Sequence, residues 1–228
     1  MAMPGPFPKK TKKIANRFNG CAAFGFLLFP GVALAHGSGP GLGGFISGFI
    51  HPLVEPAHLI ALIAFALLIG QQGIKATYPG LPALAIASGV GLLLAGLGWP
   101  MGTDVALLVC AALSGLAVVL AKPLPRATYV IAAIWTGLGI GVASAPDGPR
   151  DSAMISTMLG TGAGVFIWAA NGATLVQAQK KPWARVLVRV LASWMAACAV
   201  LFLALNVAPK KSVNTPLVSP PASQANST

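Results

Sequence analysis

Three histidines and one glutamate form the main concentration of metal-ligand side chains in this chain. His36, His51 and His58 are all of the histidines in 228 residues, and Glu55, the only glutamate, lies between the last two. His51, Glu55 and His58 are spaced i, i+4, i+7, which places them on one face of a helix. Imidazole and carboxylate groups gathered on one face predict a transition-metal site or a proton relay.

Two prolines lie within the same stretch of sequence. Pro52 and Pro56 each remove a backbone hydrogen bond from a helix. A broken first helix is therefore expected, and broken helices in membranes line cavities where transporters place their substrates. The alternative interpretation is that each histidine is a polar anchor near a membrane interface.

His36 adds a further donor set if the preceding segment is removed. Cleavage after Ala35 would make His36 the N-terminus, and its amine and imidazole could then chelate one ion. These nitrogens suit Ni(II), Co(II), Cu(II) and Zn(II). A glycine-rich link, residues 37–44, is long enough to fold back, so we predict a metal site formed by His36, His51, Glu55 and His58.

The elements that must position these residues are membrane spans. The sequence is 56% hydrophobic and only 8% charged, which is typical of an integral membrane protein in contact with the lipid bilayer. Apolar runs near the ~20 residues needed to cross a bilayer recur along the chain. They lie at about 44–70, 79–98, 104–121, 127–145, 153–178 and 186–207. We predict an all-α polytopic bundle of six transmembrane helices occupying residues 36–208.

Segments of a different kind flank this domain. Residues 1–35 have a basic stretch, a short apolar run and an Ala-Leu-Ala end, the layout of a cleavable signal peptide. An uncleaved anchor is the alternative, and the precursor has seven hydrophobic segments in either case. Residues 209–228 are rich in Ser, Pro, Asn and Ala and are expected to form a disordered tail.

The distribution of charged residues among the loops predicts the orientation of the protein in the membrane. The loops expected inside contain seven basic residues and no acid, whereas the loops expected outside contain all three aspartates. By the positive-inside rule, the mature N-terminus lies outside a bacterial inner membrane. The net charge of +11 is thereby explained by targeting and orientation, and nucleic acid is not an expected partner.

Other features are assigned structural roles. Glycine runs such as 137–141 and 160–164 favour close helix packing. Trp99, Trp168, Trp183 and Trp194 include candidates for interface anchors. The motifs GxSxG, HExxH and CxxC do not occur, so we do not expect an enzyme.

Several segments resemble one family of membrane proteins. Residues 36–39, 44–52, 58–61 and 189–197 resemble HupE/UreJ proteins, which have the signature His-Pro-x-x-Gly-x-Asp-His. The resemblance implies a nickel or cobalt permease. Glu55 and Ala57 occupy the Gly and Asp positions of the signature, and Glu55 is a possible substitute for the missing aspartate. The family's His-Gly-x-x-His-Gly pattern is replaced here by residues 136–141, so this is a divergent member.

Three functions follow as hypotheses. The first is transport of a divalent transition-metal ion, nickel or cobalt by resemblance, through a His/Glu site near the outer face of the first span. The second is a non-transporting membrane subunit or assembly factor of a larger complex. The third is a haem- or pigment-binding protein with His51 or His58 as axial ligand, which is disfavoured because the histidines are confined to one segment.

Overall fold

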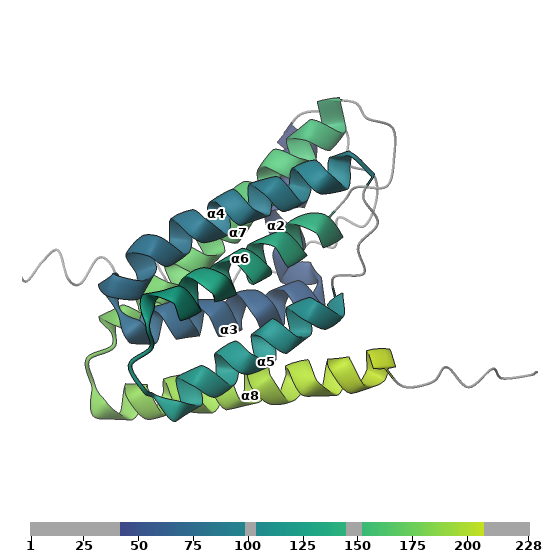
Figure 1. The fold of residues 1–228 in the computed structure, drawn as a ribbon. Helices are drawn as coiled ribbons and strands as arrows, with labels where there is room; N and C mark the ends of the chain where they lie inside the picture. Colours follow the sequence, from purple (N-terminus) through teal and green to yellow (C-terminus); the bar gives the residue numbers. More distant parts are fainter. Residues whose placement is uncertain (1–41, 99–103, 145–151, 208–228) are drawn as a thin grey trace, which may run out of the picture. The chain divides into compact units, whose positions relative to one another are not determined.

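The computed structural model describes residues 42–98, 104–144 and 152–207, and within these ranges all regular secondary structure is α-helical (Figure 1). The all-α prediction is confirmed for this part of the chain. The predicted signal peptide, His36 and the C-terminal tail lie outside the described residues. The described helices are α2 (Leu42–Val54), α3 (Pro56–Gln72), α4 (Ile74–Gly96), α5 (Asp104–Leu120), α6 (Arg126–Ala143), α7 (Ser152–Ala178) and α8 (Pro182–Val207).

Each predicted apolar segment corresponds to a helix or to a pair of helices. Four helices, α4, α6, α7 and α8, are long and apolar enough to cross a bilayer, and α2 with α3 forms a fifth span if the bent pair counts as one. The remaining apolar helix, α5, has 17 residues and is about 25 Å long, slightly less than the ~30 Å hydrocarbon core. These helices support an integral membrane protein, and the count of six spans stays a prediction.

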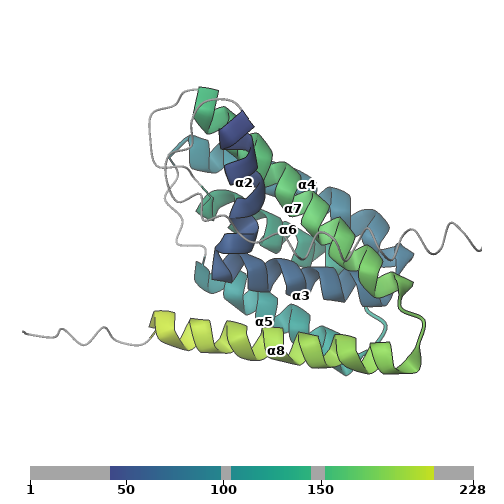
Figure 2. The same cartoon turned by 180° about the vertical axis from the view of Figure 1, so that it is seen from behind.

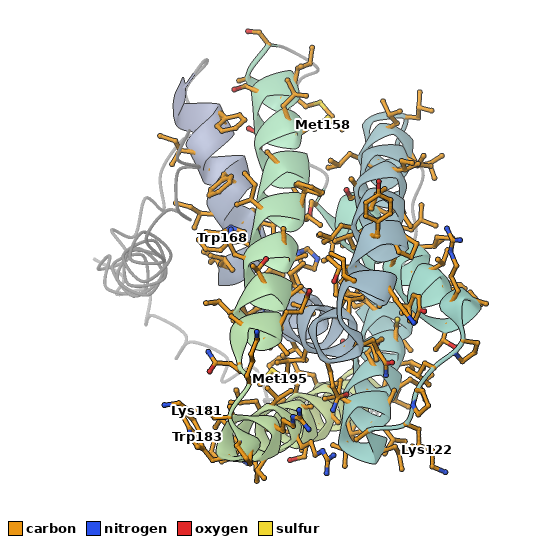
Figure 3. All side chains as sticks on the ribbon, turned by 90° about the vertical axis from the view of Figure 1, so that its left-hand side faces the viewer. Lys122, Met158, Trp168, Lys181, Trp183 and Met195 are labelled. Carbon is orange, nitrogen blue, oxygen red and sulfur yellow. The ribbon has the colours of Figure 1, made fainter. Side chains whose placement is uncertain are left out.

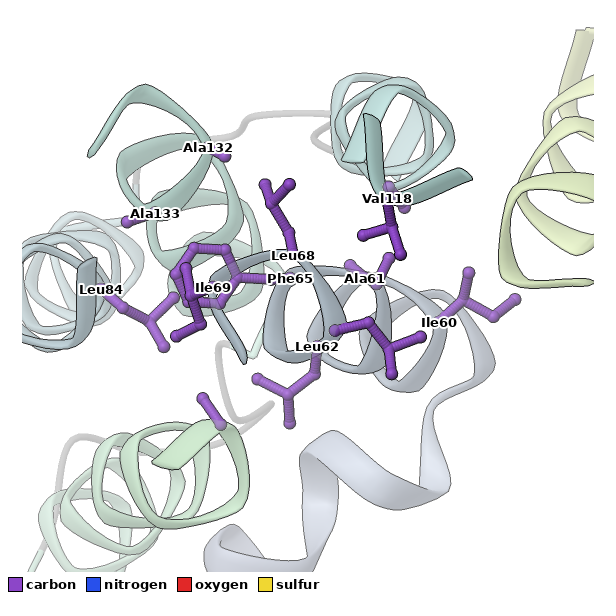
Figure 4. Packing of buried hydrophobic residues seen from close by; sticks show 14 of the residues in the cluster. Ile60, Ala61, Leu62, Phe65, Leu68, Ile69, Leu84, Val118, Ala132 and Ala133 are labelled. Atoms are coloured by element: carbon purple, nitrogen blue, oxygen red, sulfur yellow. The ribbon is translucent and has the colours of Figure 1, made fainter. Parts of the chain in front are cut away.

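Helix α3 lies at the centre of the described helices and contacts all the others (Figures 1 and 2). Its side chains are buried around nearly the whole circumference from Ala57 to Gly70, as expected for a helix that is apolar on every face. Phe65, Leu68 and Ile69 are among its fully buried residues, and Ile69 lies beside Leu84 of α4 (Figure 4). On the other side of α3, Ala61 lies toward Val118 of α5.

The predicted second span, 79–98, begins earlier than its sequence pattern indicated. Helix α4 starts at Ile74 and includes Pro79 and Pro82. The preceding residue, Gly73, has φ of 77°, which glycine adopts without steric cost. Its N–H bonds to the carbonyl oxygens of Ile69 and Gly70 at 3.1 and 3.2 Å, so a single residue ends α3 and leads into α4.

Large apolar side chains on the outer helices point away from the bundle. Leu93 of α4, Trp194 of α8 and Leu205 of α8 are each about two-thirds exposed. Such contiguous apolar surface is rare on a soluble monomer and is suited to contact with lipid.

The glycine runs bring helix backbones into direct contact, as their sequence predicted. A Cβ at Gly137 or Gly141 of α6 would lie 2.6 Å from the Leu84 oxygen or 2.5 Å from the Ser88 oxygen of α4, respectively. Glycines 48, 160 and 164 form the same kind of contact between α2 and α7, and Gly115 approaches Ala192 of α8. Gly89 is different, because a Cβ there would meet nothing within 4 Å.

We expect Gly141→Ala to destabilise the bundle by about 1–3 kcal/mol, since the added methyl group must push α4 away from α6. Gly89→Ala is the matched control and should be neutral or slightly stabilising, because alanine is the better helix former by up to about 1 kcal/mol. Thermal unfolding of both purified variants in detergent measures the difference. Equal melting temperatures for the two variants would contradict the packing described here.

Candidate functional site

The site begins with a break in the first span, which the two prolines produce. Pro52 and Pro56 lack N–H groups, so neither can donate to the carbonyl four residues earlier. Residues before proline avoid the helical conformation, and Glu55 is extended, with φ −79° and ψ 115°. Helices α2 and α3 are consequently bent by 75° relative to each other. Pro52 lies within α2, so the break falls at the second proline.

The bend brings two of the predicted ligands together. His51 lies in the last turn of α2 and His58 in the first turn of α3. Their ring centroids are 5.4 Å apart, and the ring planes meet at 73°. His58 is only 1% exposed, and His51 is half-buried.

The two rings carry buried nitrogen atoms that have no hydrogen-bond partner among the described residues. These atoms are Nε2 of His51 and Nδ1 of His58. A buried polar atom left without a partner costs about 1–3 kcal/mol, so two such atoms on neighbouring rings are costly unless another group binds there. The unpaired nitrogens are therefore the feature of this site that points to a ligand.

The other predicted ligands are placed differently. Glu55 lies at the break itself and is exposed, so the break removes the single helical face on which the sequence analysis placed it with His51 and His58. His36 lies outside the described residues. Within the described ranges, no group of three or more His, Cys, Asp or Glu side chains is arranged to hold a metal ion. The His51–His58 pair is thus the part of the predicted set that the structure brings together.

Trp168 of α7 helps to position the end of α2. Trp168 lies on the side of α7 that faces α2 (Figure 3). Its Nε1–H donates a 3.2 Å hydrogen bond to the carbonyl oxygen of Phe49, and the centres of the Trp168 and Phe49 rings are 5.5 Å apart. Sequence reasoning counted this tryptophan among possible interface anchors and missed the contact, which joins residues 119 positions apart.

The positions of the family's second histidine pattern are occupied by buried residues that pack in the bundle. Thr136 and Ile140 of α6 occupy the two histidine positions and are almost completely buried. The hydroxyl of Thr136 lies 3.8 Å from the sulfur of Cys110 on α5. The intervening Gly137 packs on the α4 backbone, so this stretch of α6 is used for helix packing.

Three polar residues in the second half of α7, Asn171, Thr174 and Gln177, differ in whether they bond to another helix. Gln177 donates a 2.7 Å hydrogen bond to Thr77 of α4. Asn171 and Thr174 are exposed, and each donates to a carbonyl oxygen of its own helix. They contribute nothing to the histidine pair.

An apolar helical bundle with several helices able to cross a bilayer defines an integral membrane protein. The HupE / UreJ protein family matches residues 24–202, and the chain belongs to that family. Membership implies a membrane function related to nickel or cobalt transport, in a family of permease-type proteins. The chain has no significant match among curated proteins or solved structures.

Removing the tryptophan hydrogen bond should loosen the end of α2. We expect Trp168→Phe, which keeps an aromatic ring but loses the N–H donor, to cost about 1 kcal/mol, or a melting temperature lower by roughly 2–4 °C. Trp194→Phe on the exposed face of α8 is the control and should leave the melting temperature unchanged. A Trp168→Phe variant as stable as the control would show that the bond does not hold α2.

Proposed function

We propose that this protein moves a divalent transition-metal ion, nickel or cobalt, across the membrane by way of the His51–His58 pair. The observation that carries the proposal is the pair of adjacent imidazoles at the break between α2 and α3, each with a buried nitrogen that has no partner among the described residues. Family membership supports the choice of cargo. Imidazole nitrogen is a good donor for both ions.

The separation of the rings fits one shared ion. Two imidazoles bound to one tetrahedral metal ion at nitrogen–metal distances of about 2.1 Å have ring centroids roughly 5 Å apart. The measured separation is 5.4 Å. The ion would replace hydrogen-bond partners that the two nitrogens lack, and this offsets part of the cost of burying them.

A site with only two protein ligands is better suited to passing a metal ion on than to holding it permanently. Structural zinc sites use four protein ligands in a closed arrangement, whereas the described residues present two imidazoles here. Water would complete the coordination of an ion at this position, so the ion can leave as well as enter. A transport site needs both steps, because tight binding would stop movement through the protein.

Glu55 and His36 have supporting roles in the proposal. Glu55 is exposed at the break, three residues before His58, where a carboxylate attracts a divalent cation toward the pair. If the precursor is cleaved after Ala35, the His36 amine and imidazole form a first capture site at the mature N-terminus. Both residues act before the ion reaches the His51–His58 pair.

The test is uptake of nickel and cobalt by cells expressing the protein with His51→Gln and His58→Gln together. We expect uptake to fall at least tenfold, because glutamine keeps a polar side chain but loses the imidazole nitrogen. Ser114→Ala, which truncates a buried polar side chain on α5, is the control for general loss of polar packing. Normal uptake by a well-expressed double variant would refute the proposal and favour a non-transporting membrane subunit.

The Glu55→Gln variant tests the capture of the metal ion separately from its passage through the protein. We expect the metal concentration at half-maximal uptake to rise a few-fold while the maximal rate is retained, because an exposed carboxylate acts mainly by attraction through solvent. The rise should shrink at high salt, where that attraction is screened. A lower maximal rate with unchanged half-saturation would instead place Glu55 on the path of the ion.

A further inference from the structure

A cavity lies at the end of the bundle where α3, α5 and α7 finish, far along α3 from the histidine pair. Its volume is about 610 Å³, within the usual range for small-molecule sites. Four glutamines line it, and the side-chain amide of Gln72 donates a 2.8 Å hydrogen bond to the carbonyl oxygen of Lys122. The cationic residues that line it are Lys122, Lys180, Arg185 and Arg189.

The charge of the cavity is strongly positive. None of the four acidic residues of the chain, at positions 55, 104, 147 and 151, is among the residues lining it. The helices α3, α5 and α7 end at this end of the bundle, and α4, α6 and α8 begin there, so their dipoles nearly cancel. The four cationic side chains therefore leave the cavity positive. The basic residues thus do more than complement helix ends, and the cavity is suited to an anion.

The cavity lies at an end of the bundle, and this position indicates which kind of anion it is suited to bind. Trp183, 59% exposed at the start of α8, lies at the same end of the bundle as Lys122 (Figure 3). The Lys181 ammonium lies 5.9 Å from the centre of its ring. Exposed tryptophan and lysine at helix ends are typical of the level of the lipid headgroups. Basic pockets between helices at this level are suited to phosphate-bearing headgroups.

We propose that this cavity binds the phosphate group of an anionic phospholipid. Arg185 and Arg189 are four residues apart on α8 and both line the cavity, so their guanidinium groups lie on one face of the helix. Guanidinium is the side chain best matched to phosphate oxygens. Lys122 and Lys180 complete the ring of cations from the α5–α6 and α7–α8 connections. This site is independent of the metal proposal, since it shares no residue with the histidine pair.

The test compares two charge-matched double variants of the full chain by native mass spectrometry after incubation with phosphatidylglycerol or phosphatidylcholine. Arg185→Gln/Arg189→Gln removes two charges inside the cavity. Lys75→Gln/Arg126→Gln removes two exposed charges from the same set of predicted inner loops, outside the cavity. We expect the cavity variant to bind phosphatidylglycerol about tenfold more weakly than the control variant, with phosphatidylcholine binding equal in both.

Three results would overturn the proposal. Equal losses in the two variants would mean that general surface charge attracts the lipid. Undiminished binding by the cavity variant would mean that the lipid binds elsewhere. Inorganic phosphate that displaces phosphatidylglycerol at millimolar concentration would assign the cavity to a soluble anion. If the arginine variant does not fold, Lys122→Gln/Lys180→Gln removes two cavity charges from other segments and should give the same tenfold loss.

Discussion

The burial of α3 on all sides is the constraint on which the rest of this structure depends. Helix α3 contacts every other described helix, whereas α2 packs along the first half of α7. The two helices therefore run in different directions. The change of direction must come within one or two residues, and Glu55-Pro56 provides it. The bend at Glu55-Pro56 therefore allows α3 to occupy the centre of the bundle while α2 packs on α7. His58, in the first turn of α3, is carried into the interior as a consequence.

Close backbone contacts make this central packing possible. Lipid offers no hydrophobic driving force between apolar helices, so packing quality and small residues hold them together. Glycines at the α4–α6 and α2–α7 contacts let the outer helices approach one another around α3. On α6, the two glycines of the family's second pattern, Gly137 and Gly141, still pack on the α4 backbone. The histidine positions of that pattern, Thr136 and Ile140, are almost completely buried.

The molecule separates its polar chemistry into two places. The histidine pair lies at the break between α2 and α3, where buried nitrogens without partners are suited to a cation. The cationic cavity lies at the far end of α3, where four basic side chains gather without an acid. A positive cavity repels a free metal ion, so the two sites have opposite electrostatic preferences. This separation is consistent with a transport site inside the bundle and a lipid contact at its edge.

The sequence by itself determined the helical class, the approximate positions of the apolar segments, the family and the break at the prolines. These properties depend on local composition and on a family signature, which can be read along the chain. The sequence could not predict that Glu55 would lie exposed at the break while His58 is buried, because i, i+4, i+7 spacing assumes one unbroken helix. It also could not reveal the Trp168 contact with Phe49 or the gathering of Lys122 with Arg185 and Arg189. Only the tertiary structure decided these, since they join segments that are distant in sequence and meet through the packing of helices around α3.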